Sequence, residues 1–327
     1  MLMPALKIRH ALFAFLTLAL PHSLPAQTNI VTTNTASLPA QTNVATTNTA
    51  PVYPPPPKGI VELRDVVIGK GGDTDLHADI AYPENATGPL PAVIYIHGGS
   101  WRGDTYHGSP IVHLAQSGYV GASIEYRLSK VATWPAQIQD CKLGVRWLRA
   151  NADQYHVDPN RIGVYGSSAG GHLVACLGTM ADVKEFEGNG GYPGVSSAVQ
   201  AVVDLCGPTD LTDPAINKWL LSRENWLLGV PLEQNPALWK SASPLFYVKA
   251  GDPPMFIGHG EADPAVPIDH SIRFDAALTK AGVPHQFLIV KNGGHGFTPK
   301  PGTTIDPGSS EINKTVFAFL DKYLKAP

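Results

Sequence analysis

Charged residues are scarce in this 327-residue chain, and they form no block of one sign. Asp, Glu, Lys and Arg make up only 16% of the residues, and 24 basic side chains against 27 acidic ones give a net charge of −3. Proteins that bind nucleic acid or an anionic membrane surface carry basic clusters, so we expect neither partner. With 43% apolar residues, the chain has enough material for a buried core.

Cysteine is scarce in the chain. The three cysteines, Cys141, Cys176 and Cys206, lack metal-ligand spacing. We expect buried free thiols, with a Cys141–Cys176 disulfide as the alternative. The polar segment 73–84 imitates part of a calcium loop, but Ala78 stands where the sharp turn needs glycine. We therefore predict no metal site.

Long hydrophobic runs are also absent. An apolar run over Ala11–Leu20 is too short to cross a bilayer. It follows Lys7 and Arg9 and precedes Leu24-Pro25-Ala26, the layout of a secretory signal peptide over residues 1–26. We expect cleavage after Ala26 and export to the periplasm or the cell exterior, with an uncleaved membrane anchor as the alternative.

A repeated, uncharged segment follows the apolar run. Residues 23–36 and 37–50 match at 12 of 14 positions, and residues 27–57 contain no charged side chain. Thr- and Asn-rich repeats without periodic apolar positions cannot bury a face. We interpret residues 27–58 as a flexible tether, with a surface-binding role as the alternative, and expect one domain over 59–327.

Strand-like runs alternate with helical patterns along the predicted domain, which is typical of a mostly parallel sheet with helices on both faces. Eight strands are expected, at Val61–Ile68, Leu76–Tyr82, Ala92–Ile96, Val120–Ile124, Ile162–Tyr165, Val199–Leu205, Met255–Gly258 and Gln286–Val290. Helices are expected at Pro135–Leu148, Ala169–Met180, Asp269–Lys280 and Glu311–Leu324.

An insertion over residues 207–253, after the sixth strand, is too long and aromatic for a simple crossover. Part of it predicts an amphipathic helix that could form a small lid. Packing into the local core is the alternative for its apolar side chains. The residues of the amphipathic pattern are Ile216, Trp219, Leu220, Trp226 and Leu227.

The segment Gly166–Gly170 has the sequence G-S-S-A-G, follows an expected strand and opens an expected helix. That context defines a G-x-S-x-G nucleophile elbow with Ser168 at its centre. A serine hydroxyl needs a general base. His295 follows the last expected strand, between glycines that leave its ring room to face the carboxyl edge of the sheet. Histidines that we consider less suited are His97, His172 and His259.

The imidazole needs a carboxylate that fixes its tautomer. Asp263 lies in a proline-rich turn after the seventh strand, and Glu261 and Asp210 are its rivals. The chain order Ser168, Asp263, His295 is that of the α/β-hydrolase fold. We therefore predict this fold and this triad.

The segment His97–Trp101, with the sequence H-G-G-S-W, follows the third expected strand, where this fold places a loop that donates to an oxyanion. The amide of Gly99 or Ser100 should join that of Ala169, which opens the helix after the elbow. A glycine turn that serves packing alone is the alternative. Trp101 is predicted to line the substrate site and to favour short acyl groups.

These motifs, together with Glu125–Leu128, Pro135–Leu148, Val199–Leu211 and His259–Pro267, resemble the bifunctional acetyl and feruloyl carbohydrate esterase group of α/β-hydrolases. These enzymes are relatives of the hormone-sensitive-lipase-like esterases. The resemblance implies Ser168, Asp263 and His295 as the triad and Gly98–Ser100 as the oxyanion loop. Ser100 departs from the fuller H-G-G-G form. A serine at this position keeps the backbone amide, and its side chain should narrow the acyl site.

The sequence predicts an exported serine esterase that forms an acyl-enzyme and needs no cofactor. The resemblance favours acetyl or feruloyl esters of plant polysaccharides, or small aromatic esters. A peptidase of the prolyl-oligopeptidase type is an alternative, although 59–327 leaves no room for its gating domain. A non-catalytic secreted binding protein is the other alternative.

The signal peptide generates the first prediction. N-terminal sequencing of the protein recovered from the periplasm or medium of an expressing bacterium should begin at Gln27, because Ala26 supplies the small residue before the cleavage site. Recovery of the full-length chain in the membrane fraction would instead support the uncleaved anchor.

Overall fold

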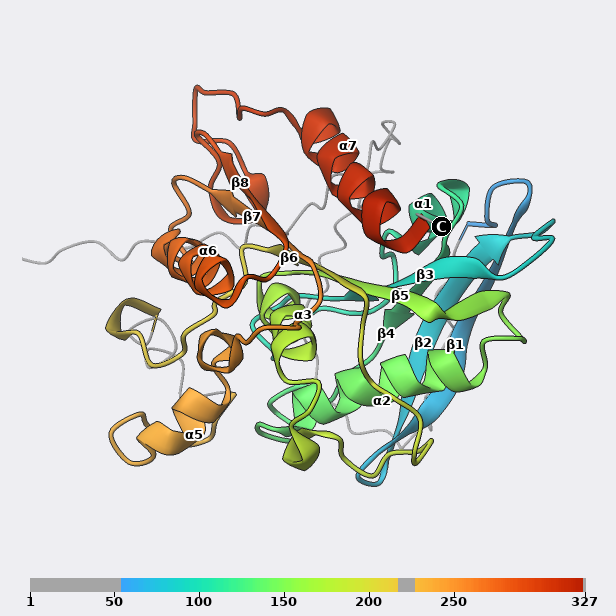
Figure 1. Cartoon of the computed structure of the whole chain (residues 1–327), viewed down its shortest axis with the longest axis horizontal. Helices are drawn as coiled ribbons and strands as arrows, with labels where there is room; N and C mark the ends of the chain where they lie inside the picture. The colour runs from blue at the N-terminus through green and yellow to red at the C-terminus, as the bar shows by residue number, and fades with distance from the viewer. Residues whose placement is uncertain (1–53, 217–226, 326–327) are drawn as a thin grey trace, which may run out of the picture. The chain divides into compact units, whose positions relative to one another are not determined.

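The computed structural model describes residues 54–216 and 227–325, and Figure 1 shows their arrangement. A compact unit comprises Pro56–Pro327. Within the two described ranges, eight strands form one sheet in the order β1-β2-β4-β3-β5-β6-β7-β8. The strands are β1 (Ile60–Gly71), β2 (Thr74–Pro83), β3 (Leu90–Ile96), β4 (Val120–Ile124), β5 (Val157–Ser167), β6 (Ala201–Leu205), β7 (Met255–Gly260) and β8 (His285–Val290).

The sheet is mostly parallel. Strand β2 runs antiparallel to both of its neighbours, β1 and β4, and every later pair from β4 to β8 is parallel. The parallel strands therefore end at one edge of the sheet, and the loops that follow β3, β5, β6, β7 and β8 gather there. This edge is where an α/β sheet places its binding site.

Helices cover both faces of the sheet (Figure 1). Helices α2, α3 and α6 contribute to one hydrophobic cluster, and α1 and α7 contribute to the cluster on the other face. The helices of the described residues are α1 (Ile111–Gln116), α2 (Ala136–Ala150), α3 (Ala169–Thr179), α5 (Pro236–Ser241), α6 (Asp269–Ala281) and α7 (Ser309–Leu320). Short 3₁₀ segments are η1 (Lys184–Phe186), η2 (Pro244–Tyr247) and η3 (His295–Phe297), and η4 (Asp321–Lys325) is a π-helical segment.

Alternation along the central strands divides the side chains between the two clusters. In β3, Ile94 joins the cluster beneath α2 and α3, and Val93 joins the cluster beneath α7. Val202 and Val203 of β6 divide in the same way. Because successive side chains of a strand point to opposite faces, a strand buried on both sides reads as a continuous apolar run.

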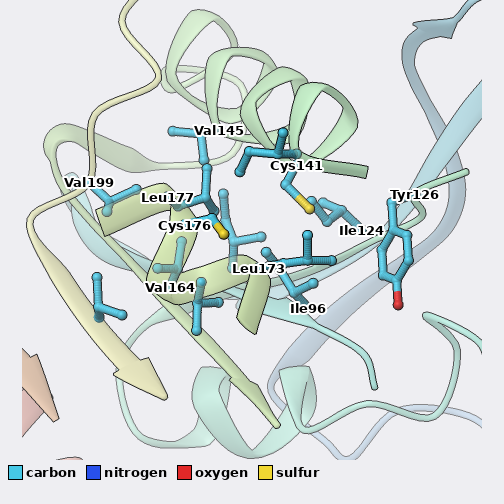
Figure 2. Close-up of a cluster of buried hydrophobic side chains, with 14 of the residues drawn as sticks. Ile96, Ile124, Tyr126, Cys141, Val145, Val164, Leu173, Cys176, Leu177 and Val199 are labelled. Carbon is cyan, nitrogen blue, oxygen red and sulfur yellow. The ribbon is translucent and has the colours of Figure 1, made fainter. Parts of the chain in front are cut away.

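The core under α2 and α3 is tightly built (Figure 2). Leu173 and Cys176 of α3 lie among Cys141 of α2 and Ile96 and Val164 of the sheet, and all five side chains are fully buried. The three cysteines are free and buried, so the expectation of buried thiols is confirmed and the disulfide alternative is wrong. This packing holds α3, and with it the segment that precedes α3, against the sheet.

All eight predicted strands and the four predicted helices are present. The helices α1 and α5 were not predicted, because six residues are too few to establish a helical period. In the insertion, Trp239 is buried and its indole donates to the carbonyl oxygen of Val230 at 3.0 Å. Local core packing, the alternative to a lid, therefore holds for Trp239.

Several expectations fall outside the described residues: the signal peptide, most of the tether, and Trp219, Leu220 and Trp226 of the predicted lid helix. Among residues 54–216 and 227–325, no helix combines the length and apolar character that a membrane crossing requires.

Candidate active site

Ser168 stands alone between the last residue of β5 and the first residue of α3. Its φ of 57° and ψ of −121° define a backbone conformation that residues other than glycine rarely adopt. Its amide donates to the carbonyl oxygen of Leu205 at 2.8 Å. A Cβ at Gly170 would lie 2.0 Å from the carbonyl oxygen of Ile96, so only glycine allows α3 to approach β3 this closely. The elbow predicted from the sequence has the required strand-turn-helix geometry.

His295 links the serine to a carboxylate. Its Nε2 lies 2.8 Å from Ser168 Oγ, and its Nδ1 lies 2.7 Å from Asp263 Oδ2. The three residues follow β5, β7 and β8, so the parallel sheet brings together side chains that are 127 positions apart in the sequence. Because the carboxylate can only accept, Nδ1 carries the proton and Nε2 is free to accept one from the serine hydroxyl.

The Asp263 carboxylate is fully buried and hydrogen-bonded on both oxygens. Its Oδ1 accepts from the amides of Ala265 and Val266 at 2.8 and 2.9 Å. Its Oδ2 also faces His259 Nε2 at 3.4 Å, and His259 is held by the carbonyl oxygen of Val266 and by Ser271 Oγ. The sequence placed His259 before this turn without revealing that it contacts the carboxylate.

The two rival carboxylates lie elsewhere. Asp210 forms an ion pair with Arg273 at 2.6 Å. Glu261 accepts from the amide of Asn292 at 3.4 Å. Asp263 is therefore the acid that the structure places on His295, and the proline-rich turn supplies the two amides that hold it.

The loop after β3 lies against the elbow. A Cβ at Gly98 would lie 3.5 Å from Ser168 Cβ. Gly99 and Ser100 have φ of 84° and 56°, so this loop turns sharply beside the serine. Ala169 is the first residue of α3, and its amide has no intrahelical acceptor. The amides predicted to bind an oxyanion thus belong to two segments in direct contact.

Tyr126 fixes the start of this loop, which the sequence did not reveal. Its hydroxyl donates to the carbonyl oxygens of His97 and Gly98 at 3.1 and 3.0 Å. Its ring stacks on the His97 imidazole with 4.3 Å between the ring centres. His97 is thereby assigned to loop packing. In the sequence, Glu125–Leu128 indicates a family resemblance and no structural role.

The structure corrects the expectation for Trp101. Only 1% of this residue is exposed, so its side chain offers almost no surface to a substrate. The indole N–H instead donates to Nδ1 of His172 at 3.1 Å. Trp101 has a left-handed φ of 57°, and its side chain packs inward against His172. The position of Trp101 in the sequence could not indicate this direction.

A family model described as BD-FAE matches residues 78–278, and a model described as the dienelactone hydrolase family matches residues 239–324. The first match covers more than half of the chain and contains Ser168 and Asp263. The chain belongs to the BD-FAE family.

Individual relatives agree with this membership. Esterase LipQ of Mycobacterium tuberculosis is 34% identical over 68% of this chain and 53% of its own length, so the chain spans about half of that relative. Carboxylesterase NlhH of the same species is 30% identical over 83% of this chain and 86% of its own. A solved structure described as a truncated carbohydrate esterase from gut microbiota is 31% identical, with a TM-score of 0.69 over 81% of this chain and 97% of that one. The BD-FAE chain therefore lies among α/β-hydrolase esterases.

Charges at the site are arranged around His295. Burial disfavours its protonated form, but hydrogen bonds and charge interactions with Asp263 and Cys206 outweigh burial and raise the pKa of His295 above its usual 6.5. Burial also disfavours the Asp263 carboxylate, yet hydrogen bonds from His259 and His295 hold its pKa well below the usual range. The acid is therefore ionised throughout the neutral range.

Two groups of potential metal ligands occur among the described residues. Cys206, Asp263 and His295 have ligand atoms within 4.8 Å of one another, as do Asp65, Asp79 and His107. In the first group, Asp263 and His295 are already hydrogen-bonded to each other. In the second, Asp79 accepts from His107 at 2.8 Å and from the amide of Asp65 at 3.0 Å. We assign no metal to either group. Cys206 lies next to the triad, which the sequence did not indicate.

The Asp263–His295 bond predicts a specific titration. Because the carboxylate stabilises the imidazolium, the His295 imidazole should titrate above pH 6.5, and Asp263→Asn should lower its pKa by on the order of one unit. Imidazole resonances followed by NMR across pH would measure both values. Asp210→Asn, which alters the rival acid, should leave the His295 titration unchanged. An unchanged His295 pKa in Asp263→Asn would contradict this assignment.

Proposed function

We propose that this protein is a serine carboxylic ester hydrolase that works through an acyl-enzyme. The observation that carries the proposal is the continuous hydrogen-bonded series Ser168 Oγ, His295 Nε2 and Nδ1, and Asp263 Oδ2, with distances of 2.8 and 2.7 Å. The esterases among its relatives support the same chemistry.

In the first half-reaction, Ser168 Oγ attacks the ester carbonyl carbon while its proton passes to His295 Nε2. The carbonyl oxygen becomes an oxyanion, and the amides of Ala169 and of Gly99 or Ser100 stabilise it. The tetrahedral intermediate then expels the alcohol, which takes the proton from His295. The acyl group remains on Ser168.

In the second half-reaction, water gives a proton to His295 and attacks the acyl carbonyl carbon. The same amides stabilise the second oxyanion. Collapse of this intermediate releases the carboxylic acid and returns the proton to Ser168 Oγ. Asp263 keeps the proton on Nδ1 throughout and stabilises the imidazolium, so Nε2 is always the atom that exchanges protons with the substrate.

For the substrate, we propose acetyl or feruloyl esters of carbohydrates, or small aromatic esters. The similarity to a carbohydrate esterase supports a carbohydrate as the alcohol part of the ester. Ser100 supports a short acyl group, because its side chain stands where a glycine would leave space beside the forming oxyanion. We also propose export, on the evidence of the N-terminal apolar run, which suits a polysaccharide substrate outside the cell.

The triad makes the first prediction for this function. Ser168→Ala and His295→Ala should each lower kcat on p-nitrophenyl acetate by several orders of magnitude, and the double variant should be scarcely worse, because the residues act as one unit. A fluorophosphonate should label the wild-type protein and not Ser168→Ala. A folded Ser168→Ala protein that keeps about a tenth of the wild-type activity would exclude the serine mechanism.

A substrate panel tests the acyl and alcohol groups. We expect kcat/KM for p-nitrophenyl acetate to exceed that for the octanoate about tenfold, with measurable release of acetate from acetylated xylan or of ferulate from methyl ferulate. Ser100→Gly should weaken the preference for acetyl because it widens the acyl site. A preference for long chains would contradict the short-acyl proposal, and cleavage of an aminoacyl nitroanilide in place of esters would indicate a peptidase.

A further inference from the structure

The buried contact between Trp101 and His172 joins the two halves of the proposed oxyanion site. Trp101 directly follows Ser100, and His172 lies one helical turn beyond Ser168 on α3. The indole N–H donates to His172 Nδ1 at 3.1 Å, and the rings meet edge to face with 5.1 Å between their centres. Both side chains are buried, so water does not compete for this hydrogen bond.

His172 is also anchored on its other side. Its amide donates to the carbonyl oxygen of Ser168 at 3.0 Å, and its Nε2 donates to the carbonyl oxygen of Ala242 at 2.7 Å. Through its ring and its backbone amide, His172 therefore connects the loop after β3, the first turn of α3 and the segment before η2.

These partners allow only one form of the His172 ring. The indole of Trp101 can only donate, so Nδ1 must carry a lone pair, and the carbonyl of Ala242 can only accept, so Nε2 must carry the proton. In an imidazolium, Nδ1 would also carry a proton, so its N–H would face the indole N–H of Trp101 with no acceptor between them. Burial lowers the pKa of His172 to about 4, which keeps this neutral tautomer in place.

The loop needs such an anchor because its backbone is strained. Ser100 and Trp101 are consecutive non-glycine residues with φ of 56° and 57°, a region that costs such residues free energy unless surrounding contacts hold them there. The carbonyl of Trp101 accepts from the amide of Ser129 at 2.7 Å, which fixes the backbone, and His172 fixes the side chain.

We propose that Trp101 and His172 are positioning residues that set the spacing between the oxyanion donors of the β3 loop and that of Ala169. This inference rests on the proposed ester hydrolysis. The hydrogen bond ties the residue after Ser100 to the helix that Ala169 begins, so the amides of both segments meet the developing oxyanion at a fixed separation. Such preorganised donors act mainly on the transition state.

Trp134 provides a matched control. It is buried and its ring also faces His172, with 5.8 Å between the ring centres. Within the described parts of the chain, however, its indole nitrogen has no hydrogen-bond partner. Trp→Phe therefore removes the same atoms at both positions, but only at Trp101 does it remove a hydrogen bond that holds the loop.

The experiment compares Trp101→Phe with Trp134→Phe. With p-nitrophenyl acetate, we expect Trp101→Phe to lower kcat about tenfold while KM changes less than about twofold, because the loss falls on the transition state. Its affinity for a trifluoromethyl ketone, whose adduct places an oxyanion in the site, should fall in parallel. Trp134→Phe should keep wild-type kcat and ketone affinity. Equal effects of the two variants on these quantities, whatever their thermal stabilities, would overturn the proposal.

Substitution of His172 provides a second route. Gln carries a carbonyl oxygen that can accept from Trp101 and an amide group that can donate to Ala242, so His172→Gln should retain more kcat and ketone affinity than His172→Leu. Equal losses in the two folded variants would contradict the proposed tautomer-specific role. Failure of the proposed function is distinguishable, because a protein with no serine mechanism would show no fluorophosphonate labelling of Ser168 in the wild type.

Discussion

The close approach of α3 to the end of β3 is the contact on which the site depends. The backbone of Gly170 lies so near the carbonyl oxygen of Ile96 that no Cβ fits between them. This contact presses the Ser168 turn against Gly98, so the proposed nucleophile and the two oxyanion segments share one packing arrangement. Any side chain at position 170 would push α3 away from the sheet. The same shift would move Ser168 and Ala169 away from the loop after β3. The contact that packs α3 on the sheet therefore also sets where the proposed oxyanion donors lie.

A buried negative charge organises the other side of the site. Removing a carboxylate from water is costly unless hydrogen bonds replace its hydration, and Asp263 receives them from two amides of its own turn and from two imidazoles. The carboxylate stays ionised, so it can hold His295 in one tautomer without taking the proton itself. The turn after β7 and the two imidazoles thus supply the hydrogen bonds that the buried carboxylate needs.

Helix α3, which follows Ser168, also contacts the loop after β3. His172 on this helix accepts from Trp101, so the strained loop after β3 is attached to the segment that begins at Ala169. Tyr126 holds the carbonyl oxygens at the start of the same loop. These hydrogen bonds fix the first peptide groups of the loop that carries the proposed oxyanion donors. In this proposal, the buried side chains of Trp101, Tyr126 and His172 determine where the oxyanion is stabilised, although they do not contact the substrate.

Local sequence determined the secondary structure and the chemistry available at the site. Strand and helix patterns are short-range, so the eight strands and the four longer helices could be predicted, and G-x-S-x-G before a helix identified Ser168. Tertiary structure decided the rest: that Asp263 and neither rival acid meets His295, that His259 and Cys206 lie beside them, and that Trp101 turns inward. The direction of a loop side chain depends on partners far away in the sequence, here His172, 71 positions from Trp101. Such partners become neighbours only when the sheet and its helices have packed.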